Sequence, residues 1–223
     1  MQFGCGPTGE KPATPTLTPT PTELLEMARR RFAETPTVHF VLEVNGETFI
    51  DPVANMRLLG AEGDLQRPGR VRTAFQVEVV GRVISLQLVS VGDEAWMTNL
   101  LTGEWGDAPP EFGYRPDILF SPRDGIGSVV EQVQGVERLE DEEIAGRAAY
   151  HVRATVAQSI VRPLSYNTIK GSPVTVDLWI DQETQDLLRV RISEPPKSDR
   201  PHPAVWTLDF SHHGEAVSIE PPV

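Results

Sequence analysis

The first periodic segment of the chain, residues 21–34, has apolar residues at helical spacing. Thr20 and Glu23 have the spacing of a capping box, in which each side chain satisfies a free backbone N–H of the other residue, and Pro21 suits the first helical position. We therefore predict an amphipathic helix that begins at residue 21 and ends before Pro36, because a residue that precedes proline disfavours helical backbone. Its apolar face consists of Leu24, Leu25, Ala28 and Phe32.

Beyond this segment, apolar and polar residues alternate over most of the chain, which is typical of strands with one buried face. Turn residues such as Asn45-Gly46 and Pro68-Gly69 separate the alternating runs. One apolar and one polar face indicate an antiparallel sheet with one side in water. The runs are centred on residues 38–44, 75–79, 84–88, 150–154, 176–180, 188–192 and 206–210.

A middle stretch, residues 116–134, departs from this alternation and predicts one short and one longer helix. Helices with one apolar face cannot bury that face on each other alone, so they must cover the apolar face of the sheet. The predicted fold class is therefore α+β. It consists of a large curved antiparallel sheet of about eight to eleven strands, an open half-barrel, whose concave face is covered by the N-terminal helix and the central helical insertion.

A segment rich in proline and threonine precedes the first helix. Proline and threonine alternate over most of residues 12–22, and proline lacks a donor N–H and has a fixed φ, so the part of this segment that precedes the helix at residue 21 is an extended spacer. Cys5, the single cysteine, lies ahead of it and follows the small residue Gly4, as in a mature bacterial lipoprotein. We predict that residues 1–20 are a lipidated tether on Cys5 and that residues 21–223 form one domain. The alternative is an exposed free thiol.

Composition and charge exclude several classes of function. The net charge is −12, with 20 basic residues scattered among 32 acidic ones, so we expect no nucleic-acid partner and no electrostatic binding to anionic lipid. No apolar run approaches the roughly 20 residues of a membrane-spanning helix. We therefore expect an extracytoplasmic, membrane-anchored lipoprotein of the cell envelope, attached through the N-terminal lipid anchor and monomeric.

Candidate catalytic and metal-binding patterns are weak. Ser128 lacks the second glycine of a nucleophile elbow, and the adjacent residues His212 and His213 point to opposite faces of a strand, so they do not chelate one ion. His151 has the polar parity of its strand and is expected at the surface. We predict no enzyme activity, no metal and no cofactor, although the many carboxylates leave a glycosidase-type pair open.

Several hairpin signatures carry a resemblance to a known family. Residues 142–152 are Glu-Glu-Ile-Ala-Gly-Arg-Ala-Ala-Tyr-His-Val, and residues 174–184 are Val-Thr-Val-Asp-Leu-Trp-Ile-Asp-Gln-Glu-Thr. Together with Leu-Leu-Arg-Val at 187–190, this text resembles the mycobacterial LppX/LprG-type lipoproteins and, more distantly, the LolA/LolB carriers and RseB-like sensors. The resemblance implies an unclosed half-barrel whose concave side holds acyl chains.

The candidate ligand-binding residues are those on the apolar side of the strands and on the underside of the insertion. For each of them taken singly, an ordinary packed core is the favoured interpretation, so only the set can mark a cavity. The alternatives to lipid binding or shuttling are an envelope sensor or regulatory interaction module of the RseB kind and a structural surface lipoprotein without a ligand. The predicted cavity lining is Phe40, Leu42, Phe75, Val77, Leu86, Leu88, Ile118, Leu119, Phe120, Val129, Val133, Leu178 and Trp206.

Overall fold

The computed structural model describes residues 18–46, 48–51, 56–108, 116–121, 123–165, 167–196 and 202–222. Cys5 and most of the predicted tether lie outside these residues. The first helix, α1 (Pro21–Glu34), has the predicted limits. Thr20 Oγ1 accepts a hydrogen bond from the Glu23 N–H at 3.3 Å, and Glu23 Oε2 accepts one from the Thr20 N–H at 2.8 Å. The predicted capping box therefore forms and fixes the start of the helix.

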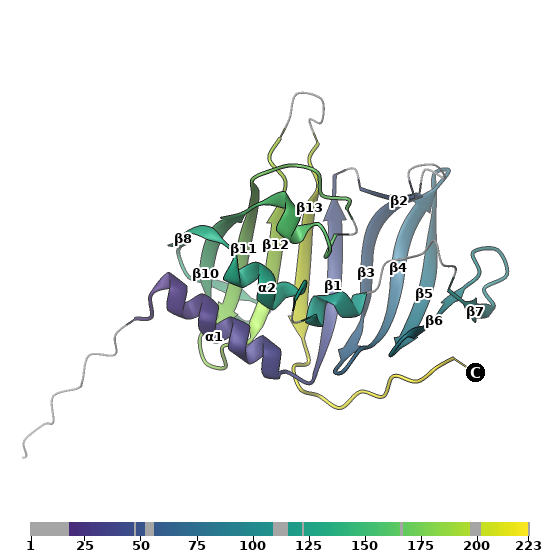
Figure 1. Cartoon of the computed structure of the whole chain (residues 1–223), viewed down its shortest axis with the longest axis horizontal. Coiled ribbons are helices and arrows are strands. Elements are labelled where there is room, and N and C mark those ends of the chain that lie inside the picture. Colours follow the sequence, from purple (N-terminus) through teal and green to yellow (C-terminus); the bar gives the residue numbers. More distant parts are fainter. Residues whose placement is uncertain are drawn as a thin grey trace, which may run out of the picture.

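One antiparallel sheet dominates the fold (Figure 1). Thirteen strands of the described residues belong to it, and eleven of them form one continuous hydrogen-bonded path. In spatial order the path runs through β7 (Trp105–Asp107), β6 (Glu94–Thr98), β5 (Arg82–Val91), β4 (Arg70–Val79), β3 (Met56–Gln66), β1 (Thr37–Asn45), β13 (Val205–Ser211), β12 (Leu187–Ser193), β11 (Val174–Asp181), β10 (Arg147–Val156) and β8 (Gln134–Arg138).

Two short strands lie beside this path: β2 (Phe49–Asp51) pairs with β3, and β9 (Glu142–Ile144) pairs with β10. β7 and β8 are at opposite ends of the path, so the sheet is open, and the predicted half-barrel is confirmed. β1 and β13 pair at the centre of the path, where strands from the two halves of the chain meet. The predicted number of about eight to eleven strands covers the eleven strands of the path, and the short strands β2 and β9 bring the sheet to thirteen.

The helical elements lie on one face of the sheet, as predicted (Figure 1). α1 contacts β8, β10 and β12, whereas the 3-10 helix η1 (Pro116–Phe120) contacts β4. α2 (Ile126–Glu131) lies against α1 and η1. The second helix of the insertion is shorter than expected, because the chain leaves it at Glu131 and has entered β8 by Gln134. A further short helix, α3 (Gln158–Val161), was not predicted.

β3 is the longest strand of the sheet among the described residues, and the alternation analysis did not identify it. Gly60 and Gly63 interrupt its apolar pattern, and its register with β4 shifts between Leu58 and Gly60. A Cβ at Gly63 would lie 2.2 Å from the Arg72 carbonyl oxygen, so only glycine allows the two strands to approach this closely. The close approach of the two strands therefore explains a glycine that interrupts the alternation and kept β3 from being predicted.

The opposite face of the sheet carries a second, smaller apolar cluster, in which Trp179 is the largest side chain. The ring of His151 stacks on Trp179 with 4.2 Å between centroids. Its Nδ1 lies 2.7 Å from Glu142 Oε1 and its Nε2 lies 3.0 Å from Asp177 Oδ1. His151 is only 6% exposed, so the expectation of a surface group was wrong, because the side chains of Trp179, Glu142 and Asp177 surround its ring. The cluster consists of Ile144, Ala149, Trp179 and Leu188.

None of the helices within the described ranges has both the length and the apolar character that crossing a membrane requires.

Candidate functional site

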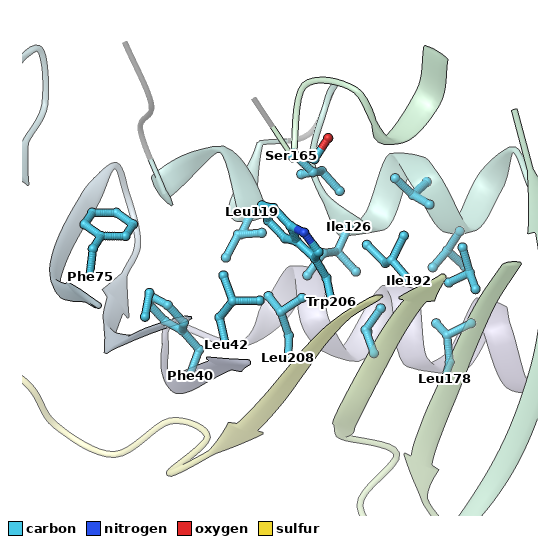
Figure 2. A pocket seen from close by; sticks show the side chains of 16 residues that line it. Phe40, Leu42, Phe75, Leu119, Ile126, Ser165, Leu178, Ile192, Trp206 and Leu208 are labelled. Carbon is cyan, nitrogen blue, oxygen red and sulfur yellow. The ribbon is translucent and has the colours of Figure 1, made fainter. Parts of the chain in front are cut away.

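An apolar cavity lies between the concave face of the sheet and the helical elements (Figure 2). Sixteen residues line it, and one of them, Ser165, is a polar residue. The other fifteen are aliphatic or aromatic: Phe40, Leu42, Ala61, Phe75, Leu119, Ile126, Val129, Val130, Leu164, Val176, Leu178, Val190, Ile192, Trp206 and Leu208.

The floor of the cavity comes from six strands of the sheet. Leu42 of β1 lies directly opposite Leu208 of β13, and Leu178 of β11 lies opposite Val190 of β12. Directly opposed residues of antiparallel strands place their side chains on the same face within contact distance. The apolar positions therefore form continuous rows across the sheet, and these rows make one uninterrupted hydrophobic floor.

The roof comes from segments that are not strands. Leu119 belongs to η1 and Val129 to α2, while Leu164 and Ser165 lie in the turn that follows α3. Gly125 joins η1 to α2, and a Cβ there would lie 2.4 Å from the Ser121 carbonyl oxygen. Glycine therefore permits the tight connection that places both η1 and α2 above the floor.

The cavity is narrow. Its volume is about 30 Å³. On the same scale, one buried water needs roughly 10–15 Å³. A methylene group takes about as much space as a water molecule, so a long acyl chain requires the roof to move away from the floor.

Seven of the thirteen predicted lining residues line this cavity: Phe40, Leu42, Phe75, Leu119, Val129, Leu178 and Trp206. The other six belong to the same hydrophobic core without lining the cavity. Val77, Leu86, Leu88 and Phe120 are buried in it, and Ile118 and Val133 pack against it while partly exposed.

Sequence reasoning missed nine of the sixteen lining residues. Val176, Val190, Ile192 and Leu208 have the apolar parity of predicted strands, so the alternation could have identified them. Leu164 and Ser165 carry no such signal, because they lie in an irregular turn whose position depends on the whole fold. The sequence therefore predicted the floor better than the roof.

Arg67 connects two elements of the roof, α1 and η1, to the sheet. Its guanidinium donates hydrogen bonds to three backbone carbonyls, those of Phe32 (3.1 Å), Thr35 (3.0 Å) and Phe120 (3.1 Å). It also lies 4.0 Å from the centre of the Phe120 ring. Burial lowers the pKa of Arg67, because a guanidinium loses hydration there. This one side chain thereby holds the C-terminal ends of α1 and η1 at the turn between β3 and β4.

Asp186, which directly precedes β12, connects α1 to the part of the sheet that contains β10 and β12. Its carboxylate lies 2.7 Å from Arg31 Nε of α1 and 3.3 Å from an Arg147 guanidinium nitrogen of β10. Burial opposes ionisation of Asp186, but hydrogen bonds from Thr184 and Arg31 outweigh it and keep the pKa of this carboxyl below its ordinary value. α1 is therefore fixed to the sheet at both Arg67 and Arg31.

α2 is held more weakly. An ion pair of 3.0 Å joins Arg29 of α1 to Glu131 of α2, with side chains that are 31% and 56% exposed. Exposed ion pairs contribute roughly 0–1 kcal/mol. The N-cap residue of α2, Gly125, offers no side-chain hydrogen bond. The ion pair that joins α2 to α1 is thus partly exposed on both sides, whereas the carboxylate that holds α1 through Arg31 is only 6% exposed.

The adjacent residues His212 and His213 have separate partners. The ring of His212 lies against that of His39 with 5.5 Å between centroids and 42° between their planes, whereas His213 Nε2 lies 3.0 Å from the Leu187 carbonyl oxygen. Within the described part of the chain, no three His, Cys, Asp or Glu residues are placed to share an ion.

The match to a family of known proteins extends over the whole described fold. The family model for LppX_LprAFG lipoproteins matches residues 20–219. The chain belongs to the LppX_LprAFG lipoprotein family. This match begins at the capping residue of α1, so it covers the sheet, the roof and the cavity between them.

Solved structures of this family have the same fold. LprF from Mycobacterium bovis is similar with a TM-score of 0.70 at 20% identity, covering 91% of this chain and 96% of that chain. LppX from Mycobacterium tuberculosis is similar with a TM-score of 0.65 at 15% identity, covering 90% of this chain and 98% of that chain. A search of curated proteins finds no match.

Proposed function

We propose that this LppX_LprAFG-family chain binds a ligand with an acyl chain in the cavity between the sheet and the roof. The observation that carries the proposal is the lining, in which fifteen of sixteen residues are aliphatic or aromatic. Burial of hydrocarbon contributes roughly 0.8 kcal/mol per methylene, so such a surface binds a chain without any charged partner. The rows of opposed apolar residues on the floor suit a long, narrow ligand.

Binding requires the roof to open, and the links described above favour α2 as the part that moves. α1 is fixed through Arg31 and through the carbonyls that Arg67 binds, whereas α2 has one exposed ion pair to α1. Removal of α2 from the floor exposes Ile126, Val129 and Val130, whose side chains would then cover the ligand instead of the sheet.

We further propose that the protein works as a lipoprotein of the cell envelope, held at the membrane through acylated Cys5. The proposal rests on membership of a lipoprotein family and on the position of Cys5 ahead of the Pro/Thr spacer. With a net charge of −12, the folded part has no electrostatic attraction to anionic lipid. A covalent anchor would supply the attachment that this charge opposes.

The binding proposal is tested with two matched substitutions. Leu178 lines the cavity, and Leu86 is equally buried in the same core without lining it. Leu178→Phe fills the cavity from the floor and is expected to reduce uptake of a long-chain acyl ester at least tenfold in native mass spectrometry. Leu86→Phe overpacks a tight site, so it costs about 1–3 kcal/mol of stability and leaves uptake by the folded protein unchanged.

If wild type and Leu178→Phe take up the ester equally well, the binding site lies elsewhere. Absence of any uptake by the wild-type protein would favour a structural lipoprotein without a ligand.

A further inference from the structure

One polar atom of the cavity lining has no partner. The indole Nε1–H of Trp206 is buried, and no hydrogen-bond acceptor reaches it among the residues that the structure describes. Trp206 itself is 4% exposed and lines the cavity. Figure 2 shows its indole, with the nitrogen, rising from β13 among the apolar side chains. A buried indole N–H usually has a hydrogen-bond partner.

A second polar group lines the same cavity. The Ser165 hydroxyl donates to the Arg162 carbonyl oxygen at 3.4 Å and accepts from the Ile169 N–H at 3.4 Å. Figure 2 shows the Ser165 oxygen pointing away from the Trp206 indole and the other lining side chains, so Ser165 lines the cavity without directing its hydroxyl into it. No side chain of the lining carries a charge. The polar groups of the lining are therefore neutral.

The geometry points to Trp206 Nε1–H as the donor for a neutral carbonyl oxygen of the ligand, such as that of an acyl ester. This inference rests on the proposed binding of an acyl chain and names the group that the cavity recognises on it. An ionised carboxylate fits poorly, because a buried charge needs a paired cation and the lining has none. A plain hydrocarbon fits the walls but leaves the indole N–H unsatisfied.

Trp179 provides a control inside the same chain. Its indole Nε1–H is also buried and has no partner in the described part of the chain, and the residue is 2% exposed. It belongs to the small cluster on the opposite face, against His151, and does not line the cavity. A change at Trp179 therefore removes a comparable buried donor without altering the cavity.

The test compares three ligands of matched chain length, delivered from cyclodextrin to the folded protein: methyl palmitate, palmitate and heptadecane. The indole ¹⁵N–¹H resonance of Trp206, assigned by its loss in Trp206→Phe, is expected to move downfield with methyl palmitate and to move less with heptadecane. Methyl palmitate is expected to bind roughly three- to tenfold tighter than heptadecane, which is the size of one hydrogen bond.

Replacement of Trp206 by 3-benzothienylalanine keeps the shape of the ring and removes the donor, so the preference for the ester over the hydrocarbon is expected to disappear. The same replacement at Trp179 is expected to preserve it. Retention of the preference in the Trp206 analogue would overturn the inference while leaving acyl-chain binding intact. The inference would also be overturned if the Trp206 resonance reports a hydrogen bond before ligand is added and does not move afterwards, because a bound water then accepts from the indole N–H.

Failure of all three ligands to bind would overturn the proposed function as well.

Discussion

Among the described glycines, Gly63 leaves the least space for a Cβ, because the neighbouring strand passes closest to it. A Cβ there would lie 2.2 Å from the Arg72 carbonyl oxygen and 2.8 Å from the Thr73 Cβ. Both neighbours belong to β4, which is paired on both sides, so neither strand can shift without disturbing the ladder.

Gly63→Ala is therefore expected to destabilise the fold by about 2–3 kcal/mol, measured as the free energy of unfolding in urea. Gly106→Ala is the matched control, because Gly106 also lies in a strand and has no atom within 4 Å of its Cβ position. An equal loss in the two variants would contradict the steric explanation.

Single residues also mark where the alternation pattern fails. The alternation in residues 188–192 predicts that Leu188 lies on the same face as Val190 and Ile192, yet Leu188 belongs to the cluster on the opposite face. The register of β11 with β12 shifts at Trp179 and Ile180, which pair with Arg189 and Leu187. A bulge adds one residue and reverses the face of the side chains beyond it. Parity alone cannot reveal such a bulge, because it depends on the partner strand.

At the scale of elements, the roof determines access to the cavity. Gly127 of α2 lies beside Arg29 of α1, since a Cβ at Gly127 would be 3.6 Å from Arg29 Cγ. A disulfide between cysteines at these two positions would hold α2 on α1, which is itself fixed to the sheet. In a Cys5→Ser background, the oxidised Arg29→Cys/Gly127→Cys variant is expected to take up an acyl ester at least tenfold more slowly than the same variant after reduction.

The double variant Arg29→Ser/Gly127→Ser controls for loss of the ion pair with Glu131, and its uptake is expected to be insensitive to oxidation. Uptake that is equally fast with and without the disulfide would show that α2 is not the part that opens.

The helices and strands could be predicted from the sequence to different degrees. α1 was predicted to the residue, because a capping box and a helical apolar face are local signals. β3 was missed, because Gly60 and Gly63 replace the apolar residues that alternation requires. The turn after α3 that completes the roof has no local signal, since Leu164 is 4% exposed but lies in no helix or strand whose apolar period could mark it.

At the scale of the whole molecule, two buried carboxylates couple folding to pH. Burial raises the pKa of Asp181. Hydrogen bonds from the Thr184 and Glu183 backbone N–H groups and from Arg147 lower this pKa by a larger amount, so the net shift is downward. Asp186 shows the same net direction. A carboxyl whose pKa is lowered in the folded state stabilises the fold above its unfolded pKa of about 3.9, and this contribution is lost as pH falls through the folded value.

Asp186→Asn is therefore expected to cost about 1–3 kcal/mol at pH 7, because it removes the charge that Arg31 and Arg147 contact. The difference from wild type is expected to shrink as the pH falls below the unfolded pKa of about 3.9 toward the lower folded value, because the unfolded wild-type chain then binds the proton first. Urea unfolding at pH 7 and at pH 3 measures both values, with Asp93→Asn in an exposed turn as the control. A difference that stays constant between the two pH values would contradict this coupling.

The central claim is that an acyl chain lies between the floor and the roof, and photo-crosslinking tests it most directly. An acyl ester with a diazirine near the end of its chain is bound, irradiated, and the labelled residues are identified by peptide mass spectrometry. We predict labels on cavity residues such as Val129, Leu178 and Trp206. The rival site is the apolar tip between β6 and β7, where Leu101 is 95% exposed. Labels confined to that tip, with none on the floor or the roof, would contradict the account.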